Sequence, residues 1–284
     1  MNSGIVSRGL FMINPPDAFF DISLNRRQLM GMSLVPFTAG LPIGSWAQSG
    51  SSTVLKVGFL AHYKPFSFLD GQFQGFDLDV FKRLATIMNV ELQIHVEGMA
   101  NLQKKIASDE ISVIGNQLLA TPENRRLFDF AKTYAANQLV CIQHEDDSRD
   151  FLTLDDLFGK KLGVLANTGV EAQAKGVVGK TVLPFDSIDL ALKRLAKKEL
   201  DAVLEESLIA DFYIERDALP VKVTAPFAPP LVSGLVVRKG NKELAQRLSN
   251  AVQTAMTDGS LKAISVRWFG YDVSRPNVSH GPMR

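Results

Sequence analysis

Strand-type and helix-type patterns alternate along this sequence from Val54 to about residue 269. Short apolar runs, as at 54–60 and 111–115, alternate with segments such as 76–88 and 243–256, in which apolar residues recur every three or four positions. A helix between two strands returns the chain to the starting edge of the sheet, so the two strands run parallel. The pattern therefore predicts an α/β fold with mostly parallel sheets flanked by helices.

The first fifty residues depart from this pattern. Paired arginines, Arg26 and Arg27, precede a mildly apolar run that contains Pro36 and Pro42 and ends in small residues around Ala47. Such a run is typical of an export signal, of the Sec or the twin-arginine type, and it is too interrupted for a membrane-spanning helix. We expect residues 1–50 to be a signal and linker, cleaved near Ala47 to leave a periplasmic protein that is not embedded in the membrane. The alternative is an unstructured cytosolic tail.

Composition argues against several functions. The 284 residues carry a net charge of +1, and no basic run has interleaved aromatic residues, so nucleic-acid binding has no support. The single cysteine, Cys141, lies in an apolar run and is expected to be buried, so no disulfide stabilises the fold. The charged segment 144–150 contains His144 and acidic residues, but we interpret it as a solvated hinge loop rather than a metal site. We expect no metal and no cofactor.

The stretch 63–79, Y-K-P-F-S-F-L-D-G-Q-F-Q-G-F-D-L-D, connects the first strand to the first helix. Pro65 fixes φ and the following Asp-Gly pair favours a tight turn, so the side chains of Tyr63 and Phe66 are held on a constrained loop. Ligand sites of open α/β sheets collect where strands end and helices begin. The loop is therefore a candidate ligand site.

This stretch resembles the opening of the extracytoplasmic solute-binding proteins of polar amino-acid ABC transporters, family 3 of the periplasmic binding proteins. The resemblance extends over residues 54–270, because further motifs follow in the family's order and at its separations. They are T-P-E-N-R-R-L-F-D-F, G-V-L-A-N-T-G-V-E, L-D-A-V-L-E-E, V-S-G-L-V-V-R-K-G-N and D-G-S-L-K-A-I-S-V-R-W-F-G.

The resemblance implies a type II periplasmic-binding-protein-like fold, in which two chain crossings form a hinge and two lobes close on a ligand. Charged and proline-rich segments predict the crossings at 143–150 and 225–231. We therefore expect lobe one to comprise 51–143 and 231–273, lobe two 144–230, and a loose tail at 274–284.

The same resemblance implies the partners. They are a small polar solute, such as an amino acid or a derivative, and an ABC permease with its ATPase. The chain itself contains no G-x-x-x-x-G-K-[ST] nucleotide loop. A monomer is the usual state in the family.

Some binding positions of the family are retained. Its ligand-stacking aromatic corresponds to Tyr63, and the acidic residue that accepts hydrogen bonds from the ligand ammonium corresponds to Glu206. Phe66 is the second aromatic of the loop, with simple packing as its alternative role. Thr121 caps a short helix whose N-terminus would favour an anionic ligand group.

The family's carboxylate-binding arginine stands three residues after this threonine, where the present sequence has Asn124. Arg125 is one residue further on, and one residue turns a side chain by ~100° around a helix, so Arg125 does not automatically replace the arginine. Asparagine donates a neutral hydrogen bond, whereas arginine offers a charged pair of donors that matches a carboxylate. Either the ligand lacks a free α-carboxylate, or it reaches Arg125 through a local rearrangement.

Other binding positions also change. Gln117 and Leu119 replace small hydroxyl residues ahead of the threonine. In the second lobe the turn 167–169 keeps Thr168 but has Gly169 where a second hydroxyl is usual. We count all of these positions among the candidate ligand contacts.

Two further functions are open. Periplasmic cyclohexadienyl dehydratases share this fold, and Glu206 could act as a general acid or base if burial raised its pKa. A ligand-sensing protein is the other, although such domains are normally fused to a membrane segment. Because the sequence offers no nucleophile–base pair, we favour the binding component of an importer and expect no enzyme activity.

Overall fold

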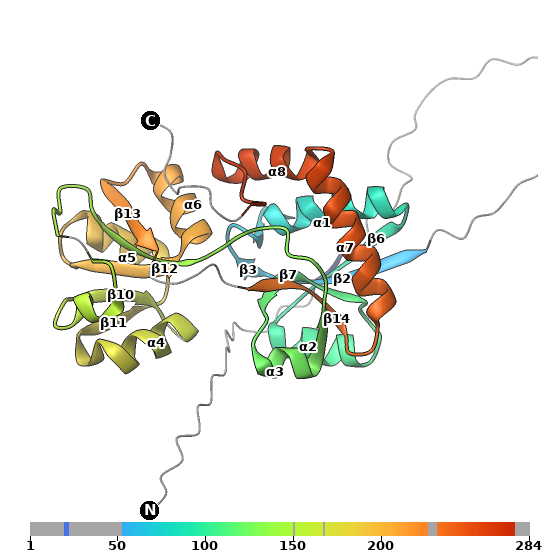
Figure 1. Cartoon of the computed structure of the whole chain (residues 1–284), viewed down its shortest axis with the longest axis horizontal. Coiled ribbons are helices and arrows are strands. Elements are labelled where there is room, and N and C mark those ends of the chain that lie inside the picture. Colours follow the sequence, from blue (N-terminus) through green and yellow to red (C-terminus); the bar gives the residue numbers. More distant parts are fainter. Residues whose placement is uncertain (1–19, 23–52, 150, 167, 227–231, 276–284) are drawn as a thin grey trace, which may run out of the picture.

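The structure, a computed structural model, describes residues 20–22, 53–149, 151–166, 168–226 and 232–275. These residues form two lobes that lie side by side, each built on a β-sheet with helices on both faces (Figure 1). The predicted two-lobed α/β fold is confirmed. Lobe one is defined here by the six-stranded sheet and lobe two by the five-stranded sheet, each with its own helices.

Lobe one is built from strands of the first part of the chain and one strand, β14, of its last part. In spatial order its strands are β1 (Phe20–Ile22), β6 (Glu91–Glu97), β2 (Val54–Leu60), β7 (Val113–Leu119), β14 (Ser233–Arg238) and β8 (Phe128–Phe130). Helices α1 (Phe76–Met88), α7 (Lys242–Thr257) and α8 (Ser260–Phe269) lie on one face, and α2 (Met99–Ala107) and α3 (Pro122–Leu127) on the other (Figure 1).

Lobe two is formed by the middle of the chain. Its strands in spatial order are β11 (Val182–Phe185), β10 (Leu162–Leu165), β12 (Ala202–Glu206), β9 (Leu139–His144) and β13 (Val221–Pro226). Its helices are α4 (Gly169–Val177), α5 (Ile188–Ala196) and α6 (Ser207–Asp217), with short 3-10 turns η2 (Leu154–Leu157) and η3 (Gly179–Thr181).

Both sheets are mixed, and the direction of each strand follows from its connection. Strands joined by a helix within one lobe pair in parallel, as β2 does with β6 and β10 with β11. The strands that follow a passage between the lobes, β9 and β14, pair antiparallel with their neighbours. The sheets are therefore less uniformly parallel than the alternation of strands and helices predicts.

The first crossing lies earlier than we predicted. We expected the strand at 138–142 in lobe one and the crossing at 143–150, but β9 pairs with β12 and β13. The chain therefore passes between the lobes in 131–138, between β8 and β9. Val140, Cys141 and Ile142 are all fully buried, so this apolar run does not reveal to which sheet it belongs. Of the second predicted crossing, 227–231 lie outside the described residues.

The two ends of the chain also differ from expectation. We expected residues 1–50 to take no part in the fold, yet β1 pairs antiparallel with the edge of β6; an unpaired strand edge accepts such an addition. The remainder of that segment lies outside the described residues. At the other end Ser274, which we expected in a loose tail, is buried and donates to Asp272 Oδ1; residues 276–284 lie outside the described residues.

One apolar core runs through both lobes. It includes Leu55, Val57 and Phe59 of β2 in lobe one, and Leu192 of α5 and Leu208 of α6 in lobe two. Ala131, Tyr134 and Ala135 of the first crossing belong to the same cluster, so the crossing is packed rather than exposed. In the part of the chain that the structure describes, no helix is long and apolar enough to cross a membrane.

Candidate functional site

The aromatic loop of lobe one is fixed to the start of α1. It is bounded by a small antiparallel sheet of β3 (His62–Tyr63), β4 (Ser67–Asp70) and β5 (Gln72–Gln74). The N–H groups of Phe76 and Asp77 donate to the carbonyls of Pro65 and Phe66 at 3.0 and 2.8 Å. Gly75 precedes the helix with φ of 145°, and a Cβ there would lie 2.1 Å from the Phe66 oxygen. Only glycine permits this close approach of loop and helix.

The two loop aromatics have different surroundings. Phe66 is 5% exposed and its ring packs against those of Phe76 and Phe269, which is the packing role that we gave as its alternative. Tyr63 is only half-buried, with its ring 4.9 Å from that of Phe66. The Phe66 ring therefore packs against the Tyr63 ring, and Tyr63 is the loop aromatic that remains partly exposed to a ligand.

Asp77 forms a buried polar cluster beneath this loop. Its side chain is 1% exposed, and it accepts hydrogen bonds from the Tyr134 hydroxyl and from Asn116 Nδ2, the latter at 2.8 Å. Asn116 also donates to Ser67 Oγ and accepts from the Leu60 N–H. Burial raises the pKa of Asp77 from 3.8 to about 7, although both side-chain hydrogen bonds act in the opposite direction. Our sequence analysis did not include this cluster.

Lobe two contributes two adjacent carboxyl groups at the end of β12. Burial raises the pKa of Glu206 to about 7, with Asn137 Nδ2 donating to its Oε2 at 2.6 Å. Burial and the neighbouring charge of Glu206 raise the pKa of Glu205 to about 8. Asn137 Oδ1 accepts from the Ser207 hydroxyl at 2.9 Å and from the Leu208 N–H at 3.3 Å. One asparagine of the crossing thereby holds the carboxyl of Glu206 and caps α6.

Tyr63 connects the groups of the two lobes. Burial raises the pKa of its hydroxyl well above the usual value, and the charges of Glu206, Asp77 and Glu205 raise it further. These charges act on Tyr63 only if they lie near it, because Coulomb interactions in a protein weaken with distance and screening. Tyr63 of lobe one and Glu206 of lobe two, two of our candidate residues, therefore lie near each other.

The candidates around α3 do not point their polar groups into that site. Thr121 Oγ1 accepts from the Asn124 N–H at 3.1 Å, as a helix cap does, and Asn124 Nδ2 donates to the Leu119 carbonyl at 2.8 Å. Arg125 is exposed; its Nε donates to the Ala120 carbonyl at 3.0 Å, and its guanidinium lies over the Phe130 ring. These donors and acceptors are thus used within α3 and its neighbourhood.

The remaining candidates have local partners as well. Gln117 Oε1 accepts from the Thr133 hydroxyl at 2.5 Å, which ties β7 to the first crossing. Thr168 donates to the Leu165 carbonyl and accepts from the Glu171 N–H, so it caps α4. Gly169 is the first residue of that helix. These contacts show how the side chains are held and identify no ligand contact for any of the three residues.

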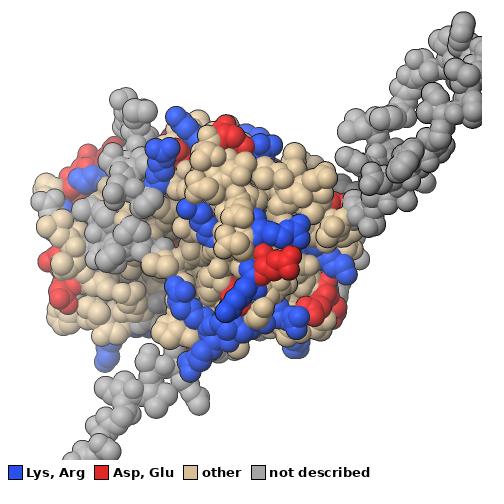
Figure 2. All heavy atoms as spheres, turned by 45° about the vertical axis from the view of Figure 1, so that its right-hand side comes forward, with Lys and Arg blue, Asp and Glu red and all other residues tan. Residues whose placement is uncertain are grey.

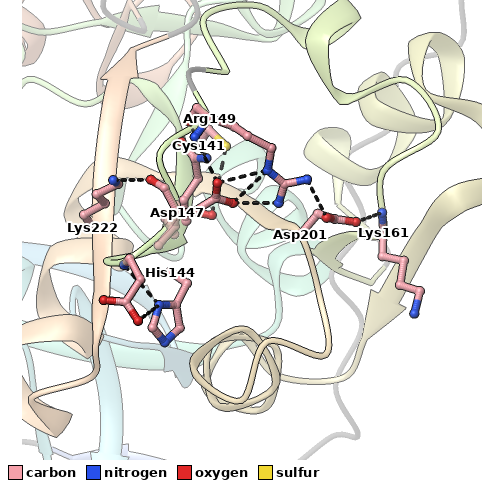
Figure 3. A network of polar contacts seen from close by, with 10 residues as sticks. Cys141, His144, Asp147, Arg149, Lys161, Asp201 and Lys222 are labelled. Carbon is pink, nitrogen blue, oxygen red and sulfur yellow. Dashed lines mark hydrogen bonds and ion pairs between the residues drawn. The ribbon is translucent and has the colours of Figure 1, made fainter.

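The charged segment after β9 is joined to lobe two by polar contacts (Figure 3). Arg149 donates to both carboxylate oxygens of Asp147 and, through Nη1, to Asp201 at 2.9 Å. Asp201 also accepts from the Lys161 N–H. Hydrogen bonds from Arg149 hold the pKa of Asp147 at about 2. The segment is an ion-paired connection, and no group of three or more His, Cys, Asp or Glu among the described residues could hold a metal ion.

Comparisons with known proteins agree with this architecture. Residues 55–271 match the family described as bacterial extracellular solute-binding proteins, family 3. The chain is 30% identical to the L-cystine-binding protein TcyJ of Escherichia coli over 89% of this chain and 98% of that protein. It is 28% identical to the L-arginine-binding protein of Pseudomonas aeruginosa, over 87% and 95% of the two chains.

Solved structures give the same result. The unliganded, open L-cystine solute receptor of Neisseria gonorrhoeae has a TM-score of 0.67 and 26% identity, covering 79% of this chain and 96% of the receptor. An ancestral cationic amino acid solute binding protein has a TM-score of 0.68 and 27% identity, covering 76% and 95%.

Proposed function

Because the chain belongs to the bacterial extracellular solute-binding proteins of family 3, we propose that it captures a small polar solute between its lobes for an ABC importer. Its relatives are named as binding proteins for cystine, arginine and other amino acids, which supports a substrate-binding role in uptake. We further propose that the protein acts outside the cytoplasm as a monomer, delivers its solute to a permease with an ATPase, and performs no catalysis itself.

One observation carries the proposed ligand site. Two residues of the first crossing, Tyr134 and Asn137, donate hydrogen bonds to Asp77 of lobe one and to Glu206 of lobe two, so the crossing holds carboxyl groups of both lobes near each other. The charge of Glu206 also raises the pKa of Tyr63, which stands on the loop above Asp77. A ligand between them would contact the face of the Tyr63 ring and pair with the carboxyl group of Glu206 as the lobes close. Asn137, on the first crossing, holds Glu206 in place. The lobe division at the corrected first crossing is part of this proposal.

Thermal unfolding of the protein with a panel of amino acids, amides, amines and dicarboxylates tests the proposal. A solute at a hundred times its dissociation constant stabilises the folded state by ~2.7 kcal/mol. Glu206→Gln and Tyr63→Ala should each reduce this stabilisation, whereas Glu215→Gln, an exposed change on α6, should leave it intact. A stabilising solute that is indifferent to both site variants would place binding elsewhere.

The alternative of an enzyme rests on one feature of the same site. Glu206 has a pKa of about 7, which suits a general acid or base at neutral pH. The two functions predict different outcomes for Glu206→Gln: a binding protein loses affinity for its solute, whereas an enzyme loses turnover and largely keeps its substrate affinity.

A further inference from the structure

The proposed site collects carboxyl groups from both lobes. Asp77 is 1% exposed and Glu205 is 3% exposed, and Glu206 is partly buried beside it. All three carboxyl groups act on Tyr63. Glu205 Oε1 accepts the Glu206 N–H at 2.8 Å, but its buried Oε2 has no hydrogen-bond partner among the described residues. A buried polar oxygen without a partner is uncommon in a folded protein.

No positive charge of the protein balances these groups in the part of the chain that the structure describes. The partners of Asp77 and Glu206 are the neutral side chains of Tyr134, Asn116 and Asn137. None of the described lysines and arginines is buried, and Figure 2 shows such side chains spread over the visible surface. An uncompensated buried charge is unfavourable, so these carboxyl groups tend to retain protons, and a cation that enters the site stabilises their ionised forms.

The side chains around the position of the family's carboxylate-binding arginine have other partners. The amide nitrogen of Asn124 donates to a main-chain carbonyl of its own lobe. Arg125 is exposed and held by the Ala120 carbonyl and the Phe130 ring. The amine of Lys239 is paired with Asp129. A ligand carboxylate placed near Asp77 and Glu206 would be repelled by their ionised forms, and no described arginine beside them offsets that repulsion.

We infer that the solute is an organic cation without a carboxylate: an amine or guanidine with one or two positive charges, or an amino acid whose carboxylate is masked as an amide. The ammonium or guanidinium pairs with Glu206 and adds its charge near Asp77, while the Tyr63 ring offers a face for a cation–π contact. This inference rests on the proposed function, because it names the ligand class of the same site.

Matched pairs of probes that differ only in the carboxylate test the inference. Calorimetric titrations of the full chain compare agmatine with L-arginine and cadaverine with L-lysine, with argininamide as a third, amide-masked probe. We expect each amine to bind at least tenfold more tightly than its parent amino acid, and argininamide to behave like agmatine. An amino acid that binds as tightly as its decarboxylated partner would overturn the inference while leaving the proposed function in place.

Substitutions at Asn124 and Glu206 test the contribution of each side chain to binding. Asn124→Arg supplies the missing donor and should narrow the preference for agmatine over L-arginine at least tenfold. Glu206→Gln should weaken agmatine binding at least tenfold, and Glu215→Gln, exposed on the same helix, should not change it. If Asn124→Arg leaves the preference unchanged, the carboxylate does not decide binding at this site and the inference fails.

Two further outcomes distinguish the cationic ligand class from the proposed transport function. Binding of only neutral or anionic solutes from the wider panel would overturn the cationic ligand class and keep the transport function. Failure of every solute in the panel to bind would overturn the proposed function, and the inference with it.

Discussion

Glu205 allows the electrostatics of the site to be tested through stability alone. Burial and the charge of Glu206 raise its pKa from 4.5 to about 8 in the folded protein. The folded state therefore holds a proton that the unfolded state releases. The stability that this proton contributes is complete below pH 4.5 and is lost as the pH rises through about 8.

The size of the effect follows from the shift. Each unit of pKa difference is worth ~1.4 kcal/mol, so the upper limit of the loss across this pH range is roughly 5 kcal/mol. Structural relaxation and the interaction with Glu206 reduce it, and we expect about 2 to 4 kcal/mol. Glutamine has no proton to release. Glu205→Gln should therefore lose less stability than the wild type between pH 5.5 and pH 8.5, by about 2 to 3 kcal/mol.

Urea denaturation of both proteins at pH 5.5, 7.0 and 8.5 measures this difference, provided that the denaturant slopes agree. Some pH dependence should persist in the variant, because Asp77 and Glu206 also have raised pKa values. Glu215→Gln serves as the matched control, since Glu215 is exposed on α6. Parallel pH profiles for the wild type and Glu205→Gln would refute the reasoning.

Three further predictions concern the supports of the site and the core. Gly75→Ala should lower the free energy of unfolding by about 2 kcal/mol or more, because φ is 145° and the added Cβ meets a carbonyl oxygen. The control Gly176→Ala, in open space on α4, should be neutral or stabilising. Asn137→Ala should lose about 2 to 4 kcal/mol in the same denaturation assay, since it removes the partner of Glu206 and the cap of α6; a loss below ~0.5 kcal/mol would contradict this. Cys141, whose pKa burial raises to about 12, should resist thiol reagents at pH 8 until the protein is unfolded, and rapid native labelling would show the strand to be open.

The sequence predicted most of the fold because the fold depends on periodic patterns. The loop 63–79 and the helix from Phe76 follow directly from the aromatic, proline and glycine positions. The assignment of β9 failed for a physical reason: Val140 and Cys141 are buried on both faces, and such a run fits either lobe until its hydrogen-bond partners are known.

The site was only partly predictable. Tyr63 and Glu206 stand in recognisable motifs, so both could be proposed before the structure. Asp77 could not, because its partners Asn116 and Tyr134 are 39 and 57 residues away in the sequence. In the sequence Asp77 is only an acidic residue in the first turn of a helix, a position that acidic residues often occupy for local reasons.

The role of Arg125 could also be argued only from the structure. The sequence showed that Asn124 replaces the expected arginine, and it left open whether Arg125 could take over. The side-chain contacts of Arg125 support our proposal that it does not, because its Nε donates to the Ala120 carbonyl and its guanidinium lies over the Phe130 ring. The side-chain direction on a six-residue helix depends on those contacts, which no sequence pattern encodes.

The most direct test of the account is the proton balance of ligand binding. Glu206 accepts a hydrogen bond from Asn137, and its pKa is about 7, so the group is partly protonated at neutral pH. A cation favours the ionised carboxylate, and binding should therefore release a proton. Agmatine keeps its own charges at this pH, so it adds no proton of its own.

The measurement is a calorimetric titration of the full chain with agmatine at pH 7 in buffers of different ionisation enthalpy. From a carboxyl with a pKa of about 7, the account predicts the release of roughly half a proton, and more if Asp77 takes part. Glu206→Gln should reduce that release. A binding enthalpy that is independent of the buffer, or uptake of protons, would contradict the claim that the carboxylates between the lobes bind the solute.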